Sequence, residues 1–210
     1  NRTFNSYTYE NEIDNYEQTH YQLHYSKQLS EITNLNAAIH YTHGEGYYEQ
    51  YKTEQEFEDY NLENIIIADD TLYSTNLIRR KWLNNDFSGI TYSLNHKMGN
   101  LDVIFGGANN RYIGQHYGNI IWAEYSSNGA INHQYYWNKG EKKDNNFYVK
   151  ANYKYSEATN LYIDIQNRSI SYIFEGYDKN GILSEQEVTH EFLNPKAGIF
   201  HHLKPNQSVY

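Results

Sequence analysis

The sequence predicts an all-β fold: an antiparallel up-and-down meander of about seven to eight strands that forms a slice of a transmembrane β-barrel. Three observations support this prediction. Apolar residues recur with a period of two, tight turns alternate with long polar connections, and the positions between the apolar residues stay polar. A period of two is typical of strands, because successive side chains point to opposite faces. Short turns at one end and long loops at the other are typical of outer-membrane barrels, whose periplasmic turns are short and whose extracellular loops are long.

The alternating segments group into four hairpins. In the first, Tyr21, Leu23 and Tyr25 alternate with polar residues, and the pattern resumes after a short connector at Leu35. The paired segments are residues 15–29 with 35–42, 90–94 with 101–106, 147–155 with 161–168, and 197–203 with a final stub at 208–210. The chain therefore predicts seven full strands and the beginning of an eighth. Long, aromatic-rich connections are expected at residues 44–75, 109–132 and 175–187.

A soluble sandwich would also alternate, so the identity of the polar positions matters. Charged and amide side chains continue along neighbouring strands opposite a narrow apolar band; they are Lys150, Asn152, Lys154, Asp164, Gln166 and Arg168. Such a band suits the apolar belt of a barrel, which is about 25 Å tall and is crossed by tilted strands of about 9–11 residues. The pattern favours a membrane barrel, in which Leu23, Ile39, Leu94, Val149 and Ile163 face lipid.

Composition excludes several classes of protein. The 210 residues carry a formal net charge of −9, which argues against a nucleic-acid partner bound through a basic face. The 24 tyrosines argue against intrinsic disorder, and the absence of cysteine excludes disulfides and thiolate metal sites. No stretch approaches the apolar length of a membrane-spanning helix.

Four segments, taken in order, resemble TonB-dependent outer-membrane receptors of Bacteroidetes-type bacteria. They are residues 40–52 (HYTHGEGYYEQYK), 77–89 (LIRRKWLNNDFSG), 106–112 (GGANNRY) and 192–198 (FLNPKAG). The resemblance implies a barrel of about 22 strands filled by a plug domain. Residues 1–210 are then expected to form part of a single β-barrel domain, with the plug domain and the remaining strands absent from this sequence.

The resemblance also implies a function. We expect an outer-membrane active-transport receptor for a large scarce nutrient, such as a ferric siderophore, haem or a cobalamin-like compound, with this segment forming barrel wall and ligand-capturing loops. The implied partners are outer-membrane lipid and lipopolysaccharide, the imported ligand, and TonB acting through the plug. No enzymatic activity and no cofactor are expected. The alternatives are a passive porin-like channel and a soluble β-rich carbohydrate-binding module.

Aromatic and cationic side chains near the long connections are the candidate ligand-binding residues. Aromatic rings offer a large rigid contact area with a polar tip, and arginine binds carboxylates, catecholates or phosphates. The candidates are Tyr47, Tyr48, Tyr51, Arg79, Arg80, Arg111, Trp122, Tyr125, Tyr136 and Trp137. For each of them, a place in an interfacial girdle is an equal alternative.

The histidines suggest a weaker metal hypothesis. If residue numbers in the first hairpin sum to about 64, His24 faces His40, and His20 lies further along the same face. The favoured interpretation is that these side chains are polar wall residues that bind water and neighbours, because no carboxylate belongs to the same patch.

Overall fold

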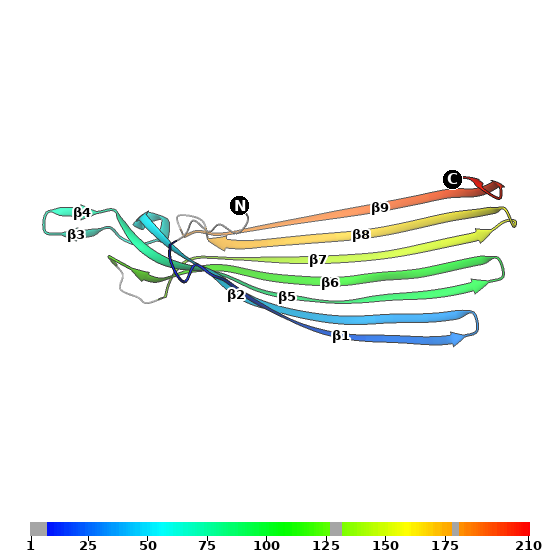
Figure 1. The fold of residues 1–210 in the computed structure, drawn as a ribbon, viewed down its shortest axis with the longest axis horizontal. Coiled ribbons are helices and arrows are strands. Elements are labelled where there is room, and N and C mark those ends of the chain that lie inside the picture. Colours follow the sequence, from blue (N-terminus) through cyan, green and yellow to red (C-terminus); the bar gives the residue numbers. More distant parts are fainter. Residues whose placement is uncertain (1–7, 127–131, 178–180) are drawn as a thin grey trace.

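The computed structural model describes residues 8–126, 132–177 and 181–210, and these residues form strands almost throughout (Figure 1). The elements are β1 (Asp14–Ser30), β2 (Thr33–Glu56), the 3-10 helix η1 (Phe57–Tyr60), β3 (Ile65–Ile67), β4 (Asp70–Leu72), β5 (Ser74–Met98), β6 (Leu101–Ala123), β7 (His133–Lys154), β8 (Thr159–Tyr177), β9 (Leu183–Lys204) and β10 (Gln207–Val209). The part of the chain that the structure describes contains no helix long and apolar enough to cross a membrane.

Eight strands form one twisted antiparallel sheet in the order β1-β2-β5-β6-β7-β8-β9-β10 (Figure 1). Seven of them are long and β10 is short, which confirms the predicted seven strands and a stub. The strands β3 and β4 form a separate small hairpin in the connection between β2 and β5. β1 and β10 are the two edges of the large sheet, which is not closed on itself.

The strands run further than the alternation of apolar residues predicts. β2 continues to Glu56 and β5 begins at Ser74, so much of the expected loop 44–75 is paired strand. The expected loops 109–132 and 175–187 are shortened in the same way by β6, β7, β8 and β9. Main-chain pairing needs no apolar side chain, and cross-strand pairs such as Tyr47 with Trp82 and Glu49 with Arg80 stabilise the extension.

The register gathers apolar residues of neighbouring strands on one side of the sheet, which we call the apolar face. One row across β2, β5, β6, β7 and β8 joins Leu35, Leu94, Phe105, Val149 and Ile165. Leu23, Ile39 and Ile163 share this face and are 63%, 50% and 44% exposed. Among the described residues, no second sheet or helix layer packs on these side chains, so they do not belong to a compact core.

The opposite side, the polar face, carries charged and amide side chains along the same strands. Asp164 pairs in register with Lys150 and Lys196, and Arg168 binds Asp144 with an N–O distance of 2.6 Å. Within the apolar band, alternation therefore produces a sheet that is apolar on one side and polar on the other, as the sequence predicts.

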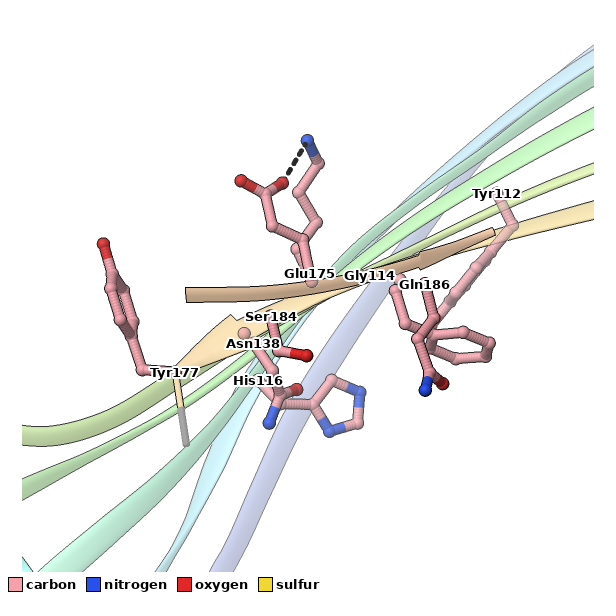
Figure 2. Close-up of a pocket in the computed structure, with 12 residues that line it drawn as sticks. Tyr112, Gly114, His116, Asn138, Glu175, Tyr177, Ser184 and Gln186 are labelled. Atoms are coloured by element: carbon pink, nitrogen blue, oxygen red, sulfur yellow. Dashed lines mark ion pairs between the residues drawn. The ribbon is translucent and has the colours of Figure 1, made fainter. Parts of the chain in front are cut away.

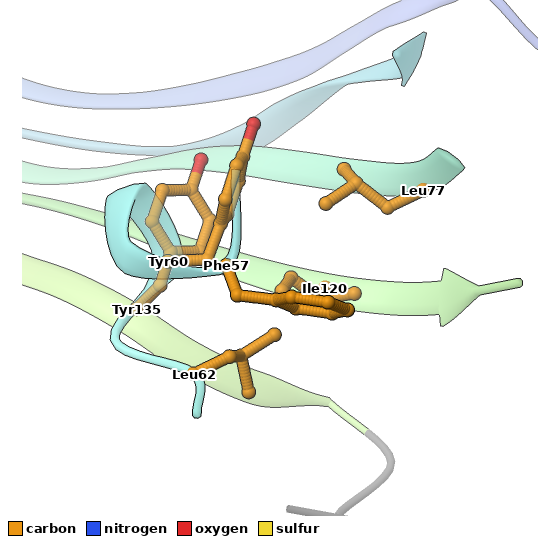
Figure 3. Packing of buried hydrophobic residues seen from close by; sticks show 6 residues of the cluster. All are labelled: Phe57, Tyr60, Leu62, Leu77, Ile120 and Tyr135. Atoms are coloured by element: carbon orange, nitrogen blue, oxygen red, sulfur yellow. The ribbon is translucent and has the colours of Figure 1, made fainter. Parts of the chain in front are cut away.

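A small hydrophobic cluster holds the connection between β2 and β5 against the polar face (Figure 3). Its buried members are Phe57, Tyr60, Leu62, Leu77, Ile120 and Tyr135. Asn61 ends η1 in the left-handed conformation (φ 54°), and its side-chain amide donates to the Tyr135 carbonyl at 2.7 Å. The cluster fixes η1 close to the long-connection end of the sheet.

Candidate functional site

The polar face is hollowed across β6, β7, β8 and β9 near the long-connection end of the sheet (Figure 2). The hollow measures about 460 Å³, and its floor contains three glycines. Gly114 pairs directly with Gly140, and Gly176 pairs with Asn138 one row further along. A glycine within a strand often marks a place where a ligand or another backbone approaches closely.

Polar and aromatic side chains form the walls of this hollow. His116, Asn138 and Ser184 lie in one row across the strands on the polar face, and Phe174 and Gln186 lie in the next row. Tyr112 completes the lining from β6. Figure 2 shows His116, Asn138, Ser184 and Gln186 on one side of the sheet.

The charged residues of the lining point to the other side of the sheet. Lys139 and Glu175 are directly paired across β7 and β8, and their charged atoms lie 3.6 Å apart on the apolar face (Figure 2). The hollow itself therefore offers an imidazole, two amides, a serine hydroxyl and aromatic rings. This combination suits a ligand that carries hydroxyl groups on a flat or partly apolar body.

The ten ligand-binding candidates do not gather on one surface. The sheet places six on the apolar face, three on the polar face, and one after the end of β6. The apolar-face residues are Tyr47, Tyr51, Arg80, Arg111, Trp122 and Trp137; those of the polar face are Tyr48, Arg79 and Tyr136; Tyr125 follows β6. None of the ten lines the glycine-floored hollow.

Two of the candidate arginines on the apolar face are already paired with carboxylates. Arg80 binds Glu49 at 2.7 Å and lies over the ring of Tyr47, 4.2 Å from the ring centre. Arg111 forms a two-pronged contact with Glu141, with distances of 2.9 and 3.1 Å. These guanidinium groups have satisfied partners within the wall.

Aromatic residues form a continuous row across the apolar face, beyond the apolar band. Tyr47 packs on Trp82 at 4.6 Å, Trp82 stacks on Tyr117 at 5.9 Å, and Trp137 contacts Tyr177 at 6.2 Å. Tyr117 and Trp137 are opposite each other in the register. About 33 Å of strand separates Trp137 from Phe147, the nearest apolar residue of the band on the same face of β7, so this row lies well away from the band's edge.

Arg79 is held on the polar face by η1. Its guanidinium donates to Gln50 at 3.0 and 3.2 Å and to the Tyr60 hydroxyl at 2.9 Å. Burial raises the pKa of Tyr60, and the neighbouring Arg79 opposes that shift. Burial also raises the pKa of Tyr135, so both hydroxyls stay protonated at neutral pH.

The proposed pairing of two histidines in the first hairpin is wrong. His24 lies opposite Ala38, and His40 lies opposite Gln22, so the register differs by two positions from the one assumed. His20 contacts the Thr42 hydroxyl at 2.9 Å and His40 contacts Asn110 at 3.0 Å. Within the described ranges, no group of three or more metal-ligating side chains comes together.

Neither the hollow nor the cluster around η1 was predicted from the sequence. Isolated glycines within strand patterns, at positions 114, 140 and 176, were a signal for the hollow. Phe57, Tyr60 and Leu62 stand out as apolar residues within an acidic stretch, and this was a signal for the cluster.

Comparison with known proteins supports the fold. No family model matches the sequence, and no curated protein matches it either. The chain is similar in structure to the ferric-catecholate import receptor Fiu of E. coli K12, with a TM-score of 0.61 and 13% identity over 95% of this chain and 32% of the receptor. It also matches the ferric yersiniabactin uptake receptor FyuA of Yersinia pestis, with a TM-score of 0.47 and 9% identity over 90% of this chain and 26% of that receptor.

The chain thus spans about a third of the length of the first receptor. The likeness to Fiu confirms the fold that the sequence predicts, an antiparallel up-and-down meander of the kind that forms part of a β-barrel wall.

Proposed function

We propose that this chain forms part of the wall of an outer-membrane receptor that imports a large scarce nutrient. A ferric siderophore is the first candidate, with haem and cobalamin-like compounds as further candidates. The observation that carries the proposal is the two-sided single-layer sheet. Its apolar face has no protein cover over Leu23, Ile39 and Ile163 among the described residues, and its polar face contains the glycine-floored hollow.

The physical argument begins with the apolar face. Large apolar patches are rarely left in water, and burial of apolar area contributes about 25 cal/mol per Å². Lipid tails provide this burial for a barrel wall, while the polar face lines a hydrated interior. A soluble carbohydrate-binding module would instead need a second layer over these side chains.

The strand extension supports a capture role for the long-connection end. β5 contains 25 residues, whereas about 9–11 residues of a tilted strand cross the apolar belt of a barrel. Much of the wall therefore stands outside the lipid, and the hollow lies in this part. Outer-membrane lipid and lipopolysaccharide, the imported ligand, and TonB acting through a plug domain are the proposed partners.

Uptake by cells tests this proposal. We would delete the gene that encodes the chain and measure uptake of radiolabelled iron from a panel of ferric chelates, haem and cobalamin in iron-limited cells. We expect the deletion to abolish uptake of one compound, and an uncoupler to abolish the same uptake in the parent strain. Uptake that persists with the uncoupler would indicate a passive channel, and unchanged uptake of every compound in the deletion strain would refute the proposal.

A further inference from the structure

Tyrosine rings cover several strand glycines of this sheet. A Cβ atom added to any of these glycines would meet a tyrosine side chain that lies against the glycine backbone. The pairs are Gly44 with Tyr16, Gly106 with Tyr148, Gly107 with Tyr92, Gly114 with Tyr112, and Gly118 with Tyr135 and Tyr136. An aromatic ring that covers a glycine on a neighbouring position restores the packing that the missing side chain leaves out.

Gly140 has no such ring among the described residues. A Cβ atom added at Gly140 would meet only the Phe174 ring, at 3.9 Å, which is an ordinary van der Waals distance. Gly140 pairs with the ring-covered Gly114 on β6, so covered and open backbone lie side by side in the floor of the hollow. The open backbone of Gly140 is therefore accessible from the hollow.

We infer that Gly140 is the binding site of a flat, hydroxylated aromatic ring of the imported ligand. The ring lies on the backbone of Gly140 as the tyrosine rings lie on the other glycines. This inference rests on the proposed function, because it names the chemical class of the group that the same hollow takes from the ligand.

The walls of the hollow match the edge of such a ring. Asn138 and Gln186 carry amides that donate and accept hydrogen bonds, and Ser184 carries a hydroxyl. The Phe174 ring flanks the open glycine and provides an apolar contact. The charged groups of Lys139 and Glu175 pair on the opposite face, so neither of them contacts the ring.

Binding of a neutral ring compound tests the inference. The probe is 4-fluorocatechol, and its binding to the complete receptor in detergent micelles is followed by fluorine NMR. Gly140→Val places a branched side chain where the ring would lie. The matched control is Gly198→Val, because Gly198 is also a polar-face strand glycine with free space, its nearest neighbour being Tyr162 at 3.8 Å.

We expect Gly140→Val to raise the Kd for the probe at least about tenfold and Gly198→Val to leave it within about twofold of wild type. Cyclohexane-1,2-diol, which has the two hydroxyls without the aromatic ring, should not compete. Equal binding by wild type and Gly140→Val, or full competition by the saturated diol, would overturn the inference.

A second variant keeps the test decisive if Gly140→Val does not fold. Ser184→Ala leaves the floor unchanged and removes one hydroxyl; we expect it to raise the Kd for the probe about two- to tenfold, and an unchanged Kd would count against the inference. Cell uptake separates the two proposals. If deletion of the gene abolishes uptake but Gly140→Val does not affect it, the ring-binding site at Gly140 is refuted and the transport function is not. If the probe binds but no uptake depends on the gene, the transport function is refuted and the ring-binding site is not.

Discussion

Replacement of Ile163 by lysine places an ammonium group in the middle of the apolar band. Ile163 lies between Leu161 and Ile165 on the same face of β8 and pairs with Ala151 and Ala197 on the neighbouring strands. Its 44% exposure shows that the sheet does not cover it, and the alanines offer no opposite charge. A lysine near the midplane of a lipid-facing barrel wall costs about 2–4 kcal/mol, so we expect a loss of this size in the free energy of unfolding.

The assay is equilibrium unfolding by guanidinium of the complete receptor in lipid vesicles, followed by tryptophan fluorescence. The control is Gln166→Lys, three positions along β8, where the side chain is on the polar face between Tyr148 and Asn194. We expect this variant to stay within about 0.5 kcal/mol of wild type. Equal penalties at the two sites, or a larger one at Gln166, would refute the assignment of the faces.

Three further predictions concern the long-connection end. Leu77→Ala removes a fully buried side chain and should destabilise the docked connection by about 2–5 kcal/mol, measured as faster hydrogen exchange in residues 57–62. Burial raises the pKa of Tyr60 and Tyr135 above the ordinary value of 10.0. The two neutral hydroxyls therefore contribute fully to the stability of the docked connection below about pH 10, and this contribution is lost as the pH rises further. Near-ultraviolet absorbance should show the ionisation, and proteolysis of this connection should increase over the same pH range. Trp82 and Trp137 lie beyond the apolar band, and lipids brominated in their tails should leave their fluorescence unquenched.

Each of these predictions has a result that contradicts it. Unchanged exchange in residues 57–62 of Leu77→Ala would show that the cluster does not hold the connection. Tyrosine ionisation at the ordinary pKa with no change in proteolysis would contradict the burial of the two hydroxyls. Strong quenching by brominated tails would place the aromatic row within the lipid.

The alternation of apolar residues was sufficient to predict the strands, their number and their two faces. It was not sufficient to predict where the strands end. Beyond the apolar band, residues such as Tyr47 and Glu49 lack the alternation of apolar and polar side chains, yet pairing with β5 continues through them. The exact register of the first hairpin was not predictable from the alternation either, because pairings that differ by two positions keep the same residues on the same face; His24 lies opposite Ala38.

The candidate site was harder to predict because neighbouring residues in a strand face opposite sides. Tyr47 and Tyr48, Arg79 and Arg80, and Tyr136 and Trp137 are consecutive pairs, so members of each pair cannot share a wall. Composition indicated which side chains could bind a ligand, but only the register shows which of them face the same space. The glycines of the hollow carry no side chain, and their role depends entirely on that register.

The extension of paired strands beyond the apolar band has a consequence for selectivity. A hollow built on a hydrogen-bonded ladder has its shape before a ligand arrives, so little binding energy is lost in ordering the protein. Its outline can then diverge through single replacements at wall positions such as Ser184 or Gln186, without any change in the length of a connection. We expect related receptors to change cargo by altering side chains on a constant frame.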